Sequence, residues 1–334
     1  MKKIVLFLII IATAITVGCY ETWYPVYNNW LSTINIDGTD LNYVRDSYGS
    51  FILSPDRETL IEYTANKFWS VDPSNLSNRT LLYDFGDVND AIDKPTISNS
   101  FIAFCYYSDV YTLDLETCVQ NRLTYTGTFT YNRYPAISSD ETKIAFAPQN
   151  DSLSSIVIMN SDGSEKNVIY EVENIGYDRK HIKSIRFVSQ DQVLLYVISN
   201  SPDSTVDKGI YSIRTDGTDN HCIVEDVYPW YLTLSPNKDY ILFSDGGYIH
   251  KVNIDGTGHV LLAESTSYYF FPSITPDGEN ILYSHNLYAR IMNKDGTNNH
   301  ELIDKTIGLT SPFYKESYFL NNYTVLIKLN KQIN

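Results

Sequence analysis

The chain has 334 residues, a formal net charge of -15 and 28 tyrosines. This acidity disfavours phosphate backbones and anionic headgroups, which bind clustered Lys and Arg, so nucleic acid is not an expected partner. The length fits a single domain built from repeats of about 40 to 45 residues.

Residues 1–18 are expected to be a signal peptide rather than part of the fold. Two lysines precede an uncharged apolar stretch, residues 4–17, which is shorter than the ~20 residues that favour a spanning helix. The stretch runs into Thr-Val-Gly-Cys at residues 16–19, which resembles the lipobox of bacterial lipoproteins. The resemblance implies cleavage before Cys19 and lipid attachment to it, with residues 19–30 as a short tether to a membrane. An ordinary signal peptide followed by an unrelated cysteine is the alternative.

A unit of four short strands then recurs along the chain. Its clearest copy contains a strand at residues 248–254, the turn Asp-Gly-Thr at 255–257, the segment Pro-Ser-Ile-Thr-Pro-Asp-Gly at 272–278 and an apolar run at 281–284. Asp-Gly supplies the positive φ angles that tight hairpins need. The same dipeptide occurs at residues 37–38, 162–163, 216–217, 255–256 and 295–296.

This repeat predicts an all-β fold of the β-propeller type. With the strands of each blade lettered A to D from the axis outward, the A strands are predicted near Phe51, Ile97, Ile137, Ile185, Leu232, Ile274 and Tyr318. Seven A strands predict seven four-stranded blades. Six blades are the alternative, because the unit from residue 68 to 107 has an Asp72-Pro73 turn without glycine.

The two ends of the repeat region each supply half a blade. The region begins with a C strand at residues 31–36 and a D strand at 41–44, and it ends with an A strand at 313–320 and a B strand at 323–329. We expect these halves to pair and close the ring, which removes an open sheet edge. The propeller domain is therefore assigned to residues 31–330.

Catalytic and metal-binding motifs are absent from the sequence. It contains no Gly-x-Ser-x-Gly, His-Glu-x-x-His, phosphate-binding glycine loop or Cys-x-x-Cys pair. His250 and His285 are expected near the same rim and are weak candidates for metal ligands, with a structural or solvated role as the alternative. No catalytic residue, metal or other cofactor is predicted.

Binding is expected at one of the two rims. Alternating strand directions place the A-B and C-D turns at one rim and the D-A and B-C connections at the other, and the second set carries aromatic residues. Tyr and Trp provide large contact areas with a polar group, as in binding hot spots. Packing between blades is the alternative role for each. The candidate residues are Tyr131, Tyr134, Tyr228, Trp230, Tyr268, Tyr269, Phe270, Phe271, Phe313 and Tyr314.

The repeat resembles the WD40-like repeat called PD40 of TolB-like propellers. The resemblance lies in residues 272–284 and in the strand-Asp-Gly-Thr units at residues 34–39, 213–218, 254–257 and 291–297. It implies a binding scaffold outside the cytoplasm, because the family's namesake is periplasmic and binds protein and peptide partners at its propeller.

Three functions are compatible with these features. The leading hypothesis is a lipid-anchored, periplasmic or surface-exposed scaffold that binds an envelope protein or peptide. The second is a carbohydrate-active enzyme resembling the oligogalacturonate lyases, which also use this repeat and would need histidines and a metal at the axis. The third is a structural surface protein without a dedicated ligand.

Overall fold

The computed structural model describes most of the chain after residue 25. The described residues are 26–333 except 36, 38, 40–41, 48, 87–90, 128–129, 174–179, 190–191, 200–207, 230, 265–271, 286–287, 303–312 and 321–323. The predicted signal peptide, Cys19 and the first part of the predicted tether therefore lie outside the described residues.

The described strands pair into seven four-stranded sheets. Three of them are β3 (Ser50–Leu53), β4 (Leu60–Tyr63), β5 (Lys67–Asp72) and β6 (Asn75–Asp84); β7 (Asp93–Ile97), β8 (Phe101–Tyr106), β9 (Asp109–Asp114) and β10 (Gln120–Arg122); and β11 (Tyr131–Ile137), β12 (Lys143–Gln149), β13 (Leu153–Asn160) and β14 (Asn167–Glu173).

Three more sheets follow in chain order. They are β15 (Lys180–Ser189), β16 (Gln192–Ser199), β17 (Gly209–Arg214) and β18 (His221–Glu225); β19 (Tyr231–Leu234), β20 (Tyr240–Asp245), β21 (Tyr248–Asn253) and β22 (Val260–Glu264); and β23 (Ser273–Ile274), β24 (Asn280–His285), β25 (Tyr288–Asn293) and β26 (His300–Glu301). The remaining sheet has the order β2-β1-β28-β27, from β2 (Asn42–Asp46), β1 (Val26–Asn35), β28 (Thr324–Ile333) and β27 (Phe313–Phe319).

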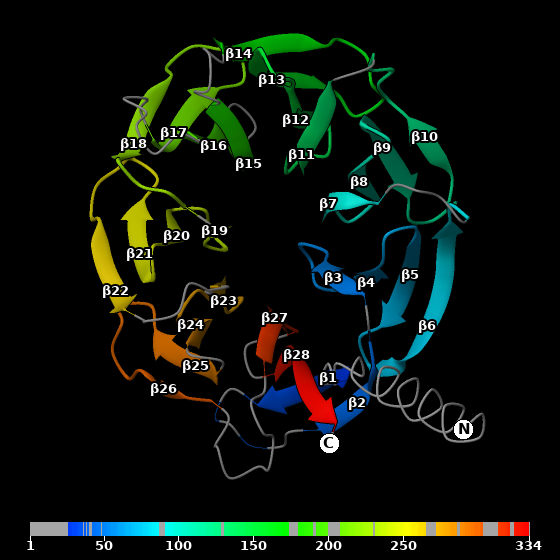
Figure 1. Cartoon of the computed structure of the whole chain (residues 1–334), viewed down its shortest axis with the longest axis vertical. Coiled ribbons are helices and arrows are strands. Elements are labelled where there is room, and N and C mark those ends of the chain that lie inside the picture. Colours follow the sequence, from blue (N-terminus) through cyan, green and yellow to red (C-terminus); the bar gives the residue numbers. More distant parts are fainter. Residues whose placement is uncertain are drawn as a thin grey trace, which may run out of the picture.

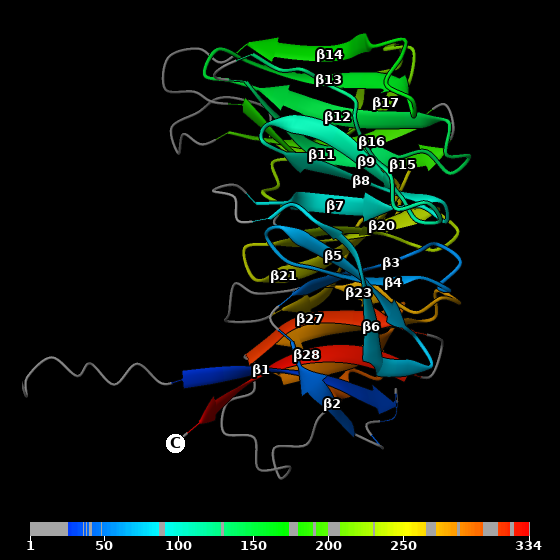
Figure 2. The ribbon, with the colours of Figure 1, turned by 90° about the vertical axis from the view of Figure 1, so that its right-hand side faces the viewer.

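The sheets stand around a common centre. Figure 1 shows β3, β7, β11, β15, β19, β23 and β27 nearest that centre, and Figure 2 shows the strands running between two rims. This architecture confirms the predicted all-β propeller. Each predicted A strand coincides with one of these inner strands.

The predicted start of the domain at residue 31 is too late. β1 begins at Val26 and pairs with β28 from Val26↔Ile333 to Asn35↔Thr324, so residues 26–30 belong to a sheet rather than to a tether. The end moves in the same way, from residue 330 to Ile333. Backbone hydrogen bonds between strands do not require alternating apolar and polar side chains. The segment Tyr-Asn-Asn at residues 27–29 lacks that alternation, so the sequence did not predict a strand there.

The core lies between neighbouring sheets. Phe68 of β5 and Phe104 of β8 are fully buried, and their ring centroids lie 5.1 Å apart in an edge-to-face arrangement. β8 is buried along nearly its whole length, because both of its faces are covered. Burying one such side chain contributes about 1.5–3 kcal/mol.

The turns at the A-B/C-D rim repeat one hydrogen-bond pattern. The Asp255 carboxylate accepts hydrogen bonds from Thr257 N at 3.0 Å and Thr257 Oγ1 at 2.6 Å, and Gly256 has a φ of 82°. Asp72 accepts equivalent bonds from Ser74 N and Oγ at 2.8 and 2.6 Å, so the turn without glycine is capped in the same way.

Within the described part of the chain, no helix has the length and apolar character needed to span a membrane.

Candidate binding rim

We call the rim formed by the D-A and B-C connections the crossover rim. Its described connections are residues 47 and 49, 64–66, 85–86, 91–92, 107–108, 123–127, 130, 150–152, 208, 226–229, 246–247, 272 and 302. Because A and C strands begin at this rim and B and D strands end there, residues from all four strands of a sheet reach it.

Exposed tyrosines mark the crossover rim. Tyr125 in the connection from β10 to β11 is 78% exposed, and Tyr131, the first residue of β11, is 51% exposed. Tyr107, in the turn between β8 and β9, and Tyr248, the first residue of β21, are exposed as well. These rings offer contact area together with a hydroxyl group.

Tyr131 thus stands where the sequence places a binding residue, but two other candidates are packed inside. Tyr134 is 7% exposed and belongs to a core cluster with Ile156 and Ile182. Tyr228 is half-buried against the cluster that contains Ile210. Their rings fill space between sheets, which is the alternative role considered for them.

Trp230, Tyr268, Tyr269, Phe270 and Phe271 lie outside the described residues. Phe313 and Tyr314 begin β27 at the crossover rim, and only their backbone is described.

The histidine that contacts His250 is His259. The Nδ1 atom of His250 lies 3.2 Å from the Nε2 atom of His259. The His250 ring also stacks on Phe243, with ring centroids 5.0 Å apart. Burial, together with the neighbouring His259, lowers the pKa of His250. His285 ends β24, and its side chain is outside the described residues. Among the described residues, no three His, Cys, Asp or Glu side chains are grouped as metal ligands.

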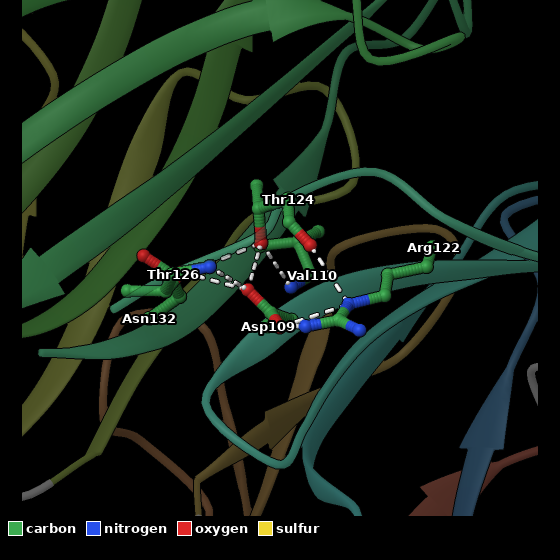
Figure 3. Close-up of polar contacts among 6 residues, drawn as sticks. All are labelled: Asp109, Val110, Arg122, Thr124, Thr126 and Asn132. Atoms are coloured by element: carbon green, nitrogen blue, oxygen red, sulfur yellow. Dashed lines mark hydrogen bonds and ion pairs between the residues drawn. The ribbon is translucent and has the colours of Figure 1, made fainter. Parts of the chain in front are cut away.

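A buried carboxylate holds one connection of the crossover rim in place. Asp109, the first residue of β9, is 1% exposed. Its Oδ1 atom accepts hydrogen bonds from Thr124 Oγ1 at 2.8 Å and from the backbone N and Oγ1 of Thr126, both at 2.7 Å (Figure 3). Its Oδ2 atom accepts from Arg122, with Nε at 3.0 Å. Asp109 therefore fixes the path of the chain as it leaves β10.

The same network continues into the next sheet. Asn132 of β11 donates through Nδ2 to Thr126 Oγ1 at 2.6 Å and to Thr124 Oγ1 at 3.1 Å (Figure 3). Val110 N donates to Thr124 Oγ1 at 2.9 Å. The start of β11, which carries Tyr131, is thereby tied to β9 of the preceding sheet.

The hydrogen bonds decide the charge of Asp109. Burial raises its pKa, but the bonds from Thr126, Thr124 and Arg122 outweigh burial, and the pKa lies below its usual value. The group is therefore an anion at neutral pH, paired with the Arg122 guanidinium. That guanidinium also lies 4.5 Å from the ring centroid of Tyr125 and so orients the exposed ring.

A second buried carboxylate anchors another connection. Glu62 of β4 is 1% exposed and accepts from Ser47 Oγ at 2.6 Å, from Arg45 Nη2 at 2.6 Å and from Arg79 Nη1 at 3.0 Å. Arg45 is the next-to-last residue of β2, the edge strand of its sheet, and Ser47 lies in the connection to β3. Burial raises the pKa of Glu62, whereas these bonds lower it below its usual value.

Neither anchor was expected from the sequence. Asp109 and Glu62 are acidic residues in short apolar strands, and their partners come from other strands and connections. Only Tyr248 had a local signal, because it directly follows the turn dipeptide Gly246-Gly247. Tyr107 lies within the two-residue connection Tyr107-Ser108, whose positive φ angles no glycine announces.

No family model matches the chain, and no curated protein sequence matches it. Solved structures do share its fold. An oligogalacturonate lyase in complex with manganese aligns over 91% of both chains with a TM-score of 0.62 and 12% identity. An oligogalacturonate lyase from Vibrio parahaemolyticus aligns over 92% of this chain and 98% of its own, with a TM-score of 0.63 and 10% identity.

TolB from Acinetobacter baumannii also aligns, over 90% of this chain and 63% of its own, with a TM-score of 0.52 and 13% identity. Identities of this size establish the fold and nothing finer. The chain is a β-propeller that is structurally similar to TolB and to oligogalacturonate lyases.

Proposed function

We propose that this protein is a lipid-anchored propeller outside the cytoplasm that binds an envelope protein or peptide at the crossover rim. The observation that carries the proposal is the set of exposed tyrosines at the crossover rim, two connections of which are held by the buried carboxylates Asp109 and Glu62. Tyr125 lies on the connection that Asp109 holds. Tyrosine provides a large contact area at low entropic cost, and fixed connections reduce the ordering that binding requires.

We further propose that the seven sheets are the seven blades of a closed ring. The sheet β2-β1-β28-β27 supports this, because it combines the first two and last two strands of the described chain. A ring fastened in this way would present the crossover rim as one continuous surface.

The binding proposal is tested by placing a photocrosslinking amino acid at Tyr107 or Tyr131 in intact cells. The matched control position is Tyr43 in β2, which is 54% exposed and follows a turn at the opposite rim. We expect one discrete adduct from both crossover-rim positions and none from Tyr43. Equal labelling from all three positions, or no adduct, would contradict the proposal, and the second result would favour a structural surface protein without a ligand.

A carbohydrate-active lyase is the second candidate, favoured by the alignment over 91% of both this chain and a lyase. The hypothesis requires a bound metal, which elemental analysis of the purified protein would detect. The His250→Ala and His285→Ala variants would then lose metal, whereas His221→Ala, an exposed histidine on another sheet, would keep it. Turnover of an oligogalacturonate by the metal-loaded chain would replace the scaffold proposal.

A further inference from the structure

Basic side chains gather on three consecutive inner strands. Lys94 lies in β7, Arg133 in β11, and Lys183 and Arg186 in β15. Lys94, Arg133 and Arg186 are exposed and Lys183 is half-buried. Such a concentration contrasts with the formal net charge of -15 on the whole chain.

Each of these strands departs from regular pairing at the crossover-rim end. The register shifts between Asp93 and Thr96 in β7, between Arg133 and Ala136 in β11, and between Ile182 and Ser184 in β15. A bulge of this kind redirects the side chains of the extra residues, and bulges are common beside functional sites.

Two of these bulges contain a lysine, Lys94 in β7 and Lys183 in β15. Lys94 has a φ of 40° and Tyr134 a φ of 56°, a conformation that costs free energy for residues other than glycine. Lys183 occupies the shift in β15, and the backbone of β27 places Lys315 at a fourth shift, between Tyr314 and Glu316. Basic residues therefore occur within or directly beside the register shift in each of β7, β11 and β15.

The other three cations act on Lys94. Burial lowers the pKa of Lys94, and Lys183, Arg186 and Arg133 lower it further, while Asp93 opposes them. β7 and β15 are separated by the sheet of β11, so Lys94 interacts with Lys183 and Arg186 across β11. Lys94 is exposed to solvent, although protein atoms around its ammonium group lower its pKa. The group is therefore accessible to a ligand.

This cluster already holds one carboxylate. Asp93 Oδ2 lies 3.6 Å from Arg133 Nη1, with both side chains partly exposed. An Arg guanidinium can bind a carboxylate through two parallel hydrogen bonds, and Lys adds a mobile point charge. A carboxylate that approaches these side chains is attracted to them, because opposite charges a few ångströms apart attract each other.

The neighbouring rings favour a peptide over a sugar as the source of that anion. Lys94 Nζ lies 4.5 Å from the ring centroid of Tyr134, and Arg133 lies 5.9 Å from that of Tyr131. A face of each ring is thus covered by a cation and is not free to stack on a pyranose ring.

We propose that Lys94, Arg133, Lys183 and Arg186 form a binding site for the carboxylates of an acidic peptide segment. The inference rests on the proposed binding function and names the class of ligand. Lys94 and Arg133 lie at the crossover-rim end of the inner strands, near Tyr131. Lys183 and Arg186 lie further along β15, where Arg186 pairs with Leu194.

Calorimetric titration of the purified protein with a hexaglutamate peptide, and with hexaglutamine for comparison, tests the site. The whole chain repels hexaglutamate, so binding requires a local cationic site, and we expect hexaglutamate to bind while hexaglutamine does not. The double variant Lys94→Gln/Lys183→Gln should weaken binding about tenfold or more.

The double variant Lys143→Gln/Lys251→Gln is the matched control. It removes the same charge from two lysines that contact Asn160 and the Tyr240 ring, and it should bind hexaglutamate like the parent chain. Removing Lys94 and Lys183 relieves repulsion, so the first variant should keep its thermal transition. If it does not fold, Lys183→Gln alone serves, with an expected loss of about threefold.

Two results would overturn the inference. One is equal binding of hexaglutamate and hexaglutamine; the other is tighter binding of trigalacturonate than of hexaglutamate with the same dependence on Lys94 and Lys183. Either result combined with a discrete adduct at Tyr131 would leave the binding function standing. If hexaglutamate binds but no adduct forms in cells, the acidic-peptide site would be supported and the proposal of an envelope partner would be contradicted.

Discussion

At the scale of single residues, the crossover rim depends on two buried acids. Asp109 and Glu62 each stand at the end of a short strand and receive hydrogen bonds from hydroxyl groups in a D-A connection and from an arginine of a D strand. A buried anion is tolerated only when it is paired and hydrogen-bonded. Both groups satisfy that condition with partners that also fix the rim.

Replacing Asp109 by asparagine should therefore lower the free energy of unfolding by about 2 kcal/mol, because an amide NH2 would face the donors of Thr124, Thr126 or Arg122. Urea denaturation measures the change. The control is Asp216→Asn in an exposed turn, where Asn can accept the hydrogen bond from Thr218 N; its effect should stay within about 0.5 kcal/mol. Equal effects of the two substitutions would contradict the anchoring role of Asp109.

The same anion makes stability depend on pH. The folded-state pKa of Asp109 lies below 3.8, its ordinary value, so the folded protein binds this proton less readily than the unfolded chain. The stabilisation is complete above pH 3.8 and is lost as the pH falls through the folded-state pKa. The parent chain should lose more stability below pH 3.8 than Asp109→Asn does, as followed by circular dichroism during acid titration. Parallel acid-titration curves would show that Asp109 does not contribute.

At the scale of elements, strands and turns were predictable because their signals are local. Alternation and Asp-Gly turns placed the inner strands, and Asp255 shows why, since its carboxylate caps a turn two residues away. The anchors and the basic cluster were not predictable. Asp109 is linked to Asn132 through threonines of a connecting segment. Lys94 and Lys183 lie in β7 and β15, which belong to different sheets, so no short window of sequence contains either set.

The close packing of β17 against β18 leaves no room for a side chain at Gly209. A Cβ atom added at Gly209 would lie 2.4 Å from the carbonyl oxygen of Val224, so Gly209→Ala must push the two strands apart. We expect a loss of about 1–3 kcal/mol in the free energy of unfolding by urea denaturation. For Gly127→Ala, no atom of the described residues other than the chain neighbours lies within 4 Å of the new methyl group, and stability should change by less than about 0.5 kcal/mol. If Gly209→Ala changed the free energy of unfolding as little as Gly127→Ala, the backbone at residue 209 would not lie this close to the Val224 carbonyl oxygen.

At the scale of the whole molecule, the sheet β2-β1-β28-β27 joins the beginning and the end of the described chain. β28 stands between β1 and β27, so its removal would leave two strands with unpaired backbone groups. Exposed edges of this kind pair with other chains and aggregate.

A chain that ends at residue 323 should therefore melt at a lower temperature than the full chain and aggregate on heating. Adding a synthetic peptide of residues 321–334 should restore the original transition, because it can refill the position between β1 and β27. Scanning calorimetry with light scattering follows both effects. An unchanged melting temperature in the truncated chain would show that the fold does not need β28 for its stability.

The direction of β1 has a consequence for how an anchored molecule would sit. As a C strand, β1 begins at Val26 on the crossover rim, so the segment that leads back to Cys19 leaves from the proposed binding surface. At about 3.3 Å per residue that segment spans at most roughly 20 Å. With the proposed lipid on Cys19, the crossover rim with its tyrosines and lysines would face the bilayer across a narrow gap, here called a slot. Such a slot admits an unfolded polypeptide strand and shuts out a globular domain.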